Sequence, residues 1–170
     1  FGVFCDIGRG ITAMMRIDRC CVSRLKSTKD YFTMGQKIHA VIYAIDDETG
    51  FIHLTGRELL GTWEENASSF NVGETVSGIV RSIENYGVFV ELAPNLAGLA
   101  ESCPKLKPGQ QASVYIKSLI PEKMKIKLII VDSFDGETEP KEPEYFITKG
   151  HIDFWQYSPE NCSKKISTVF

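Results

Sequence analysis

The sequence predicts an all-β protein made of two small five-stranded barrels joined by a short helix, and two observations carry that prediction. First, a strand-like cassette occurs twice, at Phe1–Ile7 and at Tyr86–Leu92, with the two copies 85 residues apart. A repeated sequence is typical of a repeated structural unit. Second, the stretch around the later cassette divides into five strand-like runs separated by turn residues. Closing such strands into a barrel removes the unpaired edges that an open sheet exposes.

Each cassette combines an apolar face with a mixed face. Counting by twos along a strand, the side chains expected to face the core are Val3, Cys5, Ile7, Val88, Val90 and Leu92. The opposite faces carry Phe4 with Asp6 and, in the second copy, Phe89 with Glu91. An aromatic ring on a polar face is either covered by another segment or available to a flat partner. A nucleic-acid base is such a partner.

Two aromatic rings lie three residues apart in each cassette, at Phe1 and Phe4 and again at Tyr86 and Phe89. A regular strand would point them to opposite faces. A glycine follows the first ring, Gly87 in the second copy, and a glycine there is typical of a bulge or bend. Such a bend would bring the rings together as a stacking pair. The alternative is that the first ring packs under a hairpin.

The first copy contains four strand-like runs. They are residues 1–7, 11–17, 37–45 and 51–55. In the last run, alternation places Ile52 and Leu54 inward and Phe51, His53 and Thr55 outward. A first strand matching that of the second copy is missing. We expect it upstream of the first residue, with disorder or donation from elsewhere as alternatives.

A helical stripe separates the copies. Leu59, Trp63, Ala67 and Phe70 recur at spacings of four, four and three, which predicts a helix over residues 56–70. We interpret Trp63 as an anchor of this helix on a barrel; base stacking is the alternative.

The second copy is complete. Its strands are expected at residues 73–83, 86–92, 96–100, 111–120 and 124–131, with a turn at 121–123. In the last strand Lys125 and Lys127 face outward, where the first copy has Phe51 and His53. Two cations on that face suit a phosphate backbone.

The end of the chain differs in composition from both copies. Residues 133–144 are acidic and contain two prolines, which predicts a linker with little capacity to form a core. The following segment, Tyr145–Phe170, holds too many aromatic residues for a solvated tail. We expect it to dock on a barrel, and one hypothesis is that it covers a ring face and competes with RNA.

Composition limits the function classes. The chain has 170 residues, is 43% hydrophobic and carries a net charge of −3. The charge is uneven, because residues 1–40 hold seven Lys or Arg against three acids and residues 104–127 hold six against one. No run approaches the roughly 20 apolar residues of a membrane span, and the five cysteines lack C-x-x-C spacing. We therefore expect a soluble cytoplasmic protein that has no membrane partner and whose thiols are reduced.

Enzyme activity is the least supported class. Asp46, Asp47 and Glu48 read as a hairpin, and the three histidines have no nucleophile partner in the sequence. His151 and Asp153 could form half of a metal site, although two such residues two apart often occur by chance. We expect neither catalysis nor a cofactor nor a metal.

Taken together, these elements resemble the ribosomal protein S1 repeat, an RNA-binding barrel of the oligonucleotide- and oligosaccharide-binding (OB) fold. The residues that carry the resemblance are Phe1–Phe4, Met34–Gln36, Gly50–Thr55, Tyr86–Val90, Gly98–Ala100 and Pro108–Gln110. The resemblance implies S1-type barrels at 1–58 and 71–132, a linker helix at 59–70 and a C-terminal extension at 133–170. The whole chain is similar to the C-terminal part of S1-like proteins of Firmicutes.

The resemblance also implies an RNA site on the outer face of each barrel. The candidate RNA-binding residues are Phe1, Phe4, Arg16, Asp46, Phe51, His53, Tyr86, Phe89, Lys125 and Lys127. Arg16 stands where the family has a histidine, and it remains a cation that can stack on bases or bind phosphate. The corresponding residue of the second copy is Glu101, which would repel phosphate. The second copy is therefore the weaker candidate.

Two functions follow. The leading hypothesis is binding of single-stranded RNA, in particular messenger RNA in translation, with the ribosome as a further partner. The alternative is a protein-interaction adaptor that docks on the ribosome or on an RNA-decay complex and has little RNA affinity of its own.

Overall fold

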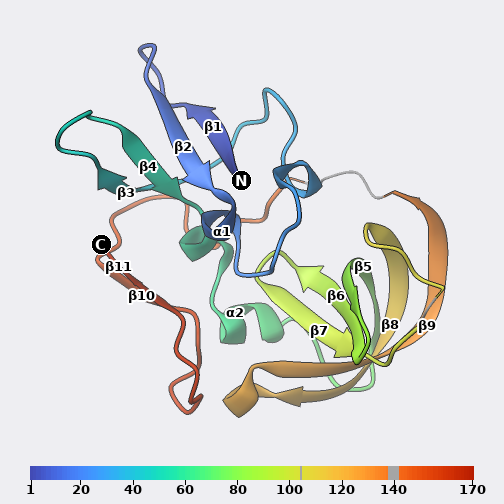
Figure 1. The fold of residues 1–170 in the computed structure, drawn as a ribbon. Helices are drawn as coiled ribbons and strands as arrows, with labels where there is room; N and C mark the ends of the chain where they lie inside the picture. Colours follow the sequence, from blue (N-terminus) through green and yellow to red (C-terminus); the bar gives the residue numbers. More distant parts are fainter. Residues whose placement is uncertain (104, 138–141) are drawn as a thin grey trace.

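The computed structural model describes residues 1–103, 105–137 and 142–170, and β-strands dominate this part of the chain. The strands are β1 (Gly2–Asp6), β2 (Thr12–Arg16), β3 (Val41–Ile45), β4 (Ile52–Thr55), β5 (Thr75–Glu84), β6 (Gly87–Ala93), β7 (Leu96–Ala100), β8 (Gln110–Ile120), β9 (Lys125–Glu137), β10 (Phe154–Gln156) and β11 (Ser167–Val169). The helical turns are α1 (Ile17–Cys20), η1 (Thr28–Asp30), η2 (Arg57–Leu60), α2 (Trp63–Ala67) and η3 (Pro121–Lys123). Figure 1 shows the four N-terminal strands as one unit and β5 to β9 as a second unit, with the short helices between them.

The second unit is the predicted closed barrel. Its strands follow the order β5-β6-β7-β9-β8, and β8 pairs with both β5 and β9. Val80, Val88, Val90, Val114 and Ile116 are fully enclosed inside it. The burial of Val88 and Val90 confirms the predicted inward face of β6, because residues two apart on a strand lie on the same side. Leu92, which was also predicted to face inward, is only partly buried.

The first unit is an open four-stranded sheet and not a barrel. Its order, β1-β2-β4-β3, repeats the order β6-β7-β9-β8 of the barrel, including one parallel pair, β2 with β4. Only the counterpart of β5 is missing among the described residues. Without that strand β1 and β3 are both edges, and Ile42 and Ile45 of β3 stay 53% and 56% exposed.

The connection between the units is not the single helix predicted over 59–70. It contains η2 and α2, and Gly61 separates them with a φ of +92°. A side chain at Gly61 would be strained in that conformation, so the helix cannot run through it. Thr62 then begins α2 with a capping box, in which its hydroxyl accepts the amide N–H of Glu65 at 3.2 Å. Trp63 is 3% exposed and packs with the barrel core.

The last strand of the barrel is longer than predicted. β9 continues to Glu137, and Gln111 of β8 still pairs with Phe134. The predicted acidic linker therefore begins inside a strand, because backbone pairing with β8 does not require apolar side chains. Residues 138–141 of that linker lie outside the described residues.

The C-terminal segment packs between the two units. Trp155 and Tyr157 are 6% and 5% exposed and lie in the same cluster as Trp63. The hypothesis that this segment covers a ring face is wrong for Phe1, Phe4 and the second-copy ring Tyr86, which are 92%, 69% and 65% exposed.

Candidate nucleic-acid interface

The outer face of the first sheet carries one row of side chains across three strands. Phe4 of β1 pairs with Met14 of β2, and Met14 pairs with His53 of β4. Gly2 pairs with Arg16, two residues along β1 and β2 from the first pair, so Arg16 lies on the same face. The structure thus brings an aromatic ring, a thioether, an imidazole and a guanidinium onto one surface.

Both rings of the first cassette are exposed, and strand pairing places Phe4 on this surface, whereas Phe1 precedes β1 and lies outside the strand register. Phe1 is 92% and Phe4 69% exposed. The opposite face of β1 packs normally, since Val3 and Cys5 contact the buried cluster of Ala13 and Met15. Ile7 was expected to face inward as well, but it lies beyond the end of β1 and is 41% exposed.

The glycine between the rings does not form the predicted bulge. Pairing between β6 and β7 is regular at its start, from Val88 opposite Ala100. A Cβ at Gly87 would lie 2.5 Å from the carbonyl oxygen of Ala100. This glycine therefore allows a close approach between the backbones of β6 and β7. The rings of Tyr86 and Phe89 still meet, with centroids 6.1 Å apart and an 85° interplanar angle, because Tyr86 precedes the strand and is free of its alternation.

Phe51 and His53 extend the first surface along β4. Their ring centroids are 5.1 Å apart at 69°, an edge-to-face contact, and both side chains are half-buried. Thr55 was predicted to lie on the same face, but its side chain does not form part of the exposed surface. It is 0% exposed, because its hydroxyl donates to the carboxylate of Glu58 at 2.7 Å and 2.9 Å.

Asp46 shapes the hairpin beside this surface. Its Oδ1 accepts the backbone N–H groups of Thr49 at 3.0 Å and Glu48 at 2.9 Å. These hydrogen bonds favour the ionised carboxylate and lower the pKa of Asp46. The contacts give Asp46 a role in the turn that joins β3 and β4.

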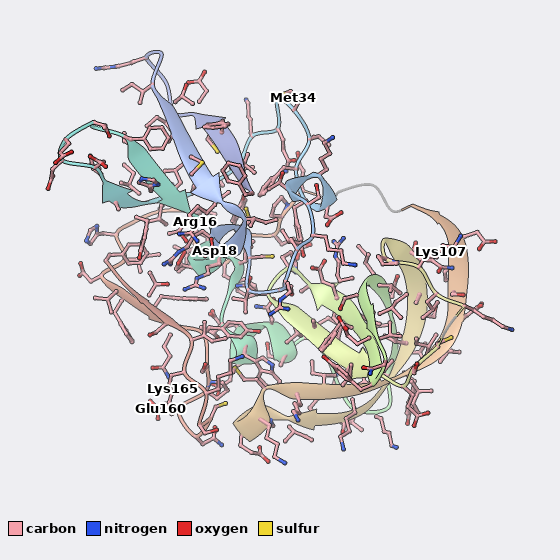
Figure 2. The ribbon with its side chains drawn as sticks, viewed as in Figure 1. Arg16, Asp18, Met34, Lys107, Glu160 and Lys165 are labelled. Atoms are coloured by element: carbon pink, nitrogen blue, oxygen red, sulfur yellow. The ribbon has the colours of Figure 1, made fainter. Side chains whose placement is uncertain are left out.

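Arg16 forms an ion pair with Asp18. Its Nη2 lies 3.2 Å from Oδ2 of Asp18, and both side chains are more than half exposed. Figure 2 shows the two residues side by side at the end of β2. An exposed pair of this kind is worth about 0–1 kcal/mol, so a phosphate can replace Asp18 at little cost.

The second unit repeats the geometry with different chemistry. Phe89 pairs with Leu99, and Leu99 pairs with Lys127, so the row of ring, apolar residue and third side chain ends in an ammonium group. Lys125 and Lys127 are exposed, and Phe89 is half-buried. Glu101 is also exposed, and the register continues to place it opposite Gly87, as Arg16 lies opposite Gly2 in the first sheet.

Glu91 was expected on the mixed face and is instead 6% exposed. It lies where the first unit covers the barrel. Its Oε2 accepts from Nη2 of Arg81 at 3.1 Å, and the Arg81 guanidinium lies 5.0 Å from the ring centroid of Tyr31. Burial raises the pKa of Glu91 to about 8, and the nearby charge of Asp30 acts in the same direction.

Sequence reasoning missed the middle positions of both rows. Met14 lies within the apolar run 11–17, which hid the alternation of Thr12, Met14 and Arg16 from an inspection by composition alone. Strict alternation from the buried Ala13 and Met15 would have found it. Nothing in the sequence indicated that the first unit would cover Glu91.

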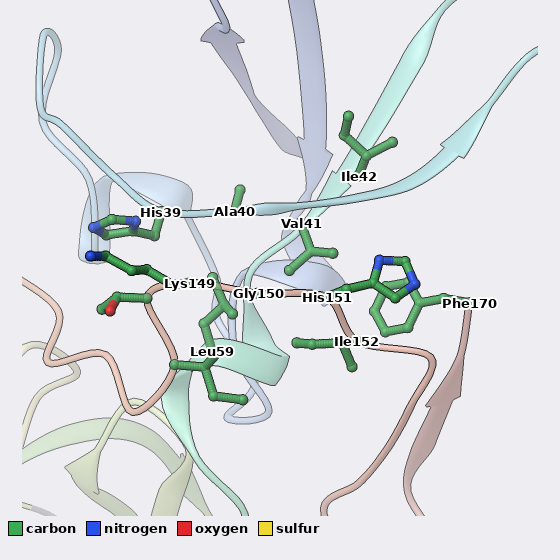
Figure 3. A pocket seen from close by; sticks show the side chains of 12 residues that line it. His39, Ala40, Val41, Ile42, Leu59, Lys149, Gly150, His151, Ile152 and Phe170 are labelled. Carbon is green, nitrogen blue, oxygen red and sulfur yellow. The ribbon is translucent and has the colours of Figure 1, made fainter.

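The histidine candidates outside this surface do not assemble a metal site. His151 Nε2 lies 2.8 Å from Oδ1 of Asp153, and both side chains are exposed. Within the described ranges no cluster of three or more His, Cys, Asp or Glu side chains has metal-binding geometry. Figure 3 shows His151 with His39 at a groove of about 340 Å³ between the start of β3 and the C-terminal segment.

No helix among the described residues is long and apolar enough to cross a membrane.

Comparison with known proteins finds relatives named small ribosomal subunit protein bS1. No family model matches the sequence. Small ribosomal subunit protein bS1 of Leuconostoc lactis is 29% identical over 140 residues, which is 75% of this chain and 32% of the relative. The bS1 proteins of Staphylococcus aureus (strain COL) and Staphylococcus saprophyticus are each 28% identical, over 90% and 81% of this chain and 42% and 38% of their own lengths.

The predicted resemblance to ribosomal protein S1 is therefore confirmed over most of the chain. The chain spans about a third to two fifths of the length of these curated relatives.

Proposed function

We propose that this chain binds single-stranded RNA and that its ligand is messenger RNA in translation. The main binding surface in this proposal is the outer face of the first sheet. The supporting observation is the exposure of Phe4 on the same face as Arg16 and His53, with the exposed ring of Phe1 directly before β1. Uncovered aromatic rings beside cations suit an anionic polymer of flat bases. The similarity to proteins named small ribosomal subunit protein bS1 supports the same proposal.

The chemistry of binding follows from the surface. Bases stack on Phe1 and Phe4, and each base–ring contact contributes about 1–3 kcal/mol without selecting a sequence. Arg16 exchanges Asp18 for a phosphate. The contacting rings of Phe51 and His53 flank the place that the next nucleotide of the RNA would occupy along β4. We therefore expect weakly selective, salt-dependent binding, with the chain acting as a binding module and not as an enzyme.

The second unit contributes less under this proposal. Its Tyr86 and Phe89 pair and its two outward lysines favour RNA. Glu101, however, is exposed where the first unit has Arg16, and a carboxylate there repels a phosphate. The half-buried Phe89 also offers less free ring surface than Phe4.

The test is a titration of a fluorescently labelled oligouridine at two salt concentrations, using the full chain and matched variants. Phe4→Ala should weaken binding by roughly 1–3 kcal/mol, as expected for the loss of one stacking contact. Phe89→Ala should cost less. Phe154→Ala is the control, because Phe154 is 58% exposed on β10, which pairs with β11 in a separate two-stranded sheet.

Four outcomes of this titration test the proposed RNA binding. Affinity should fall at higher salt with a slope of about −0.7 per phosphate contact, and a double-stranded competitor should displace the oligouridine poorly. Equal losses in Phe4→Ala and Phe154→Ala would contradict the assignment of the surface. Absence of binding at both salt concentrations would refute RNA binding and favour the adaptor that docks through protein contacts.

A further inference from the structure

A buried asparagine joins four segments of the chain. Asn95 lies in the turn between β6 and β7 and is 1% exposed. Its Oδ1 accepts the backbone N–H of Val22 at 2.9 Å, from the first unit. Its Nδ2 donates to the carbonyls of Arg57 and Gly61, both at 2.8 Å, in the connection. The Tyr157 hydroxyl of the C-terminal segment donates to the carbonyl of Asn95.

These contacts use the hydrogen-bonding capacity of the Asn95 amide on groups outside its own barrel. A buried amide is costly unless its partners are in place. The side chain is therefore satisfied only when the first unit and the connection both lie where the structure has them, which makes Asn95 sensitive to their relative position.

A second anchor ties the end of the chain to the first unit. The Glu58 carboxylate is 0% exposed, and its Oε1 accepts from the Thr168 hydroxyl of β11 at 2.9 Å. The same oxygen lies 3.5 Å from Nε of Arg57 and 3.8 Å from Nη1 of Arg19, the latter from α1. A buried carboxylate needs such partners, so β11 cannot leave without exposing a network that involves α1 and η2.

The stretch between the two anchors is held by aromatic packing. Trp155 and Tyr157 pack in one cluster with Trp63 and the barrel core. The backbone N–H of Trp63 donates to the carbonyl of Tyr157 at 3.1 Å. In Figure 1 this segment runs beside α2 and returns through β11 toward the four-stranded sheet.

We propose that the C-terminal segment 145–170 is a strut that holds the two units in one orientation, with Asn95 and Glu58 as positioning residues. Units joined by a short connection are expected to move relative to each other unless an interface prevents it. Here η2 and α2 are both too short to act as a rigid spacer. The strut extends the direct contact between the units at Asn95 and Val22, since its aromatic residues pack on the barrel side and Thr168 binds Glu58 in the network that includes Arg19 of the first unit.

The strut has a consequence that rests on the proposed RNA function. When two faces are held at a fixed spacing, a long RNA can bind both of them without a loss of conformational entropy for orienting the two units. An RNA that reaches only one face gains nothing from the orientation. The strut therefore affects affinity for long RNA and leaves affinity for short RNA unchanged.

The experiment uses the full chain in four variants. Asn95→Ala removes the central amide, Tyr157→Phe removes one hydroxyl, and Thr168→Val removes the hydroxyl that binds Glu58. Asn71→Ala is the control, because Asn71 is an exposed asparagine that hydrogen-bonds only locally, to Glu74. The milder Tyr157→Phe and Thr168→Val keep the test valid if Asn95→Ala does not fold.

Orientation is measured first, without RNA. Backbone ¹⁵N relaxation should give one shared tumbling time for both units in the unmodified chain and in Asn71→Ala. The three strut variants should give separate, shorter times for the two units, with β5–β9 chemical shifts otherwise preserved. A single shared tumbling time in all three strut variants would overturn the proposal.

RNA affinity is measured second, with oligouridines of about 5 and about 30 nucleotides, the first within and the second above the span of one OB barrel. The strut variants should bind the longer RNA roughly tenfold more weakly and the shorter RNA as the unmodified chain does. Equal weakening for both lengths would contradict the positioning role. Separate tumbling combined with no RNA binding by the unmodified chain would support the strut and refute the proposed function.

Discussion

Replacing Glu91 by glutamine should remove a loss of stability that the unmodified chain suffers as pH rises. The carboxyl is buried between the units, with Arg81 as its hydrogen-bond partner and Asp30 nearby. Burial raises its pKa from the ordinary value of 4.5 to about 8 in the folded protein. Between these two values the folded state holds a proton that the unfolded state has released.

The size of the effect follows from that difference in bound protons. One extra proton in the folded state lowers the free energy of unfolding by about 1.4 kcal/mol for each pH unit of increase. The stabilisation is fully present below about pH 4.5 and is lost as pH rises toward 8. From about pH 5.5 to about pH 7.5, titration of Glu91 should therefore lower the free energy of unfolding by roughly 2–3 kcal/mol.

Urea unfolding of the two proteins at several pH values measures this. Glu91→Gln cannot titrate, so its advantage over the unmodified chain should grow steadily across the window, whatever constant cost the lost carboxylate contact with Arg81 adds. Glu101→Gln is the matched control, because it removes an exposed glutamate of the same barrel, and its profile should follow the unmodified chain. Parallel profiles for Glu91→Gln and the unmodified chain would refute the reasoning.

Three further predictions test the fold. Fusing a copy of residues 73–85 directly before Phe1 should supply the strand that β1 and β3 lack. The free energy of unfolding should then rise by about 1.5–3 kcal/mol for each large apolar side chain that becomes buried, which a higher thermal midpoint would report. An unchanged midpoint would argue against this pairing. Gly87→Ala should lower the urea midpoint by the equivalent of about 1–3 kcal/mol, because its Cβ would meet the Ala100 carbonyl at 2.5 Å. Thr62→Ala should cost about 1 kcal/mol through loss of the α2 cap, with Thr62→Ser as the variant that restores it.

Local patterns predicted the parts of the site that depend on a single strand. Alternation in the cassettes correctly placed Val88 and Val90 inside the barrel and Phe4 outside the first sheet. The same counting failed at Thr55 and Glu91, which are both buried. At Glu91 a distant segment around Asp30 and Tyr31 lies over the face, and strand periodicity carries no information about such a cover. At Thr55 the hydroxyl bonds to Glu58 of the turn that follows β4.

The glycines show the same division at the level of the backbone. The sequence indicated that Gly87 has a special role. The structure shows that it allows a close approach between the backbones of β6 and β7 and does not form a bulge. Gly61 lies inside a regular helical stripe, so the spacing of apolar residues predicted one helix. Its φ of +92° divides that helix in two, a local conformation that the apolar spacing does not encode.

The sequence by itself determined the strand-rich architecture, the repeat and the resemblance to ribosomal protein S1, because these depend on residue order along the chain. Tertiary structure alone decided how the two units are joined. Asn95 and Glu58 look like ordinary surface residues in the sequence, and only the folded chain brings Val22, Tyr157 and Thr168 to them. The physical reason is that a buried polar group is satisfied by whichever distant partners the fold delivers, and those partners leave no periodic signal near it.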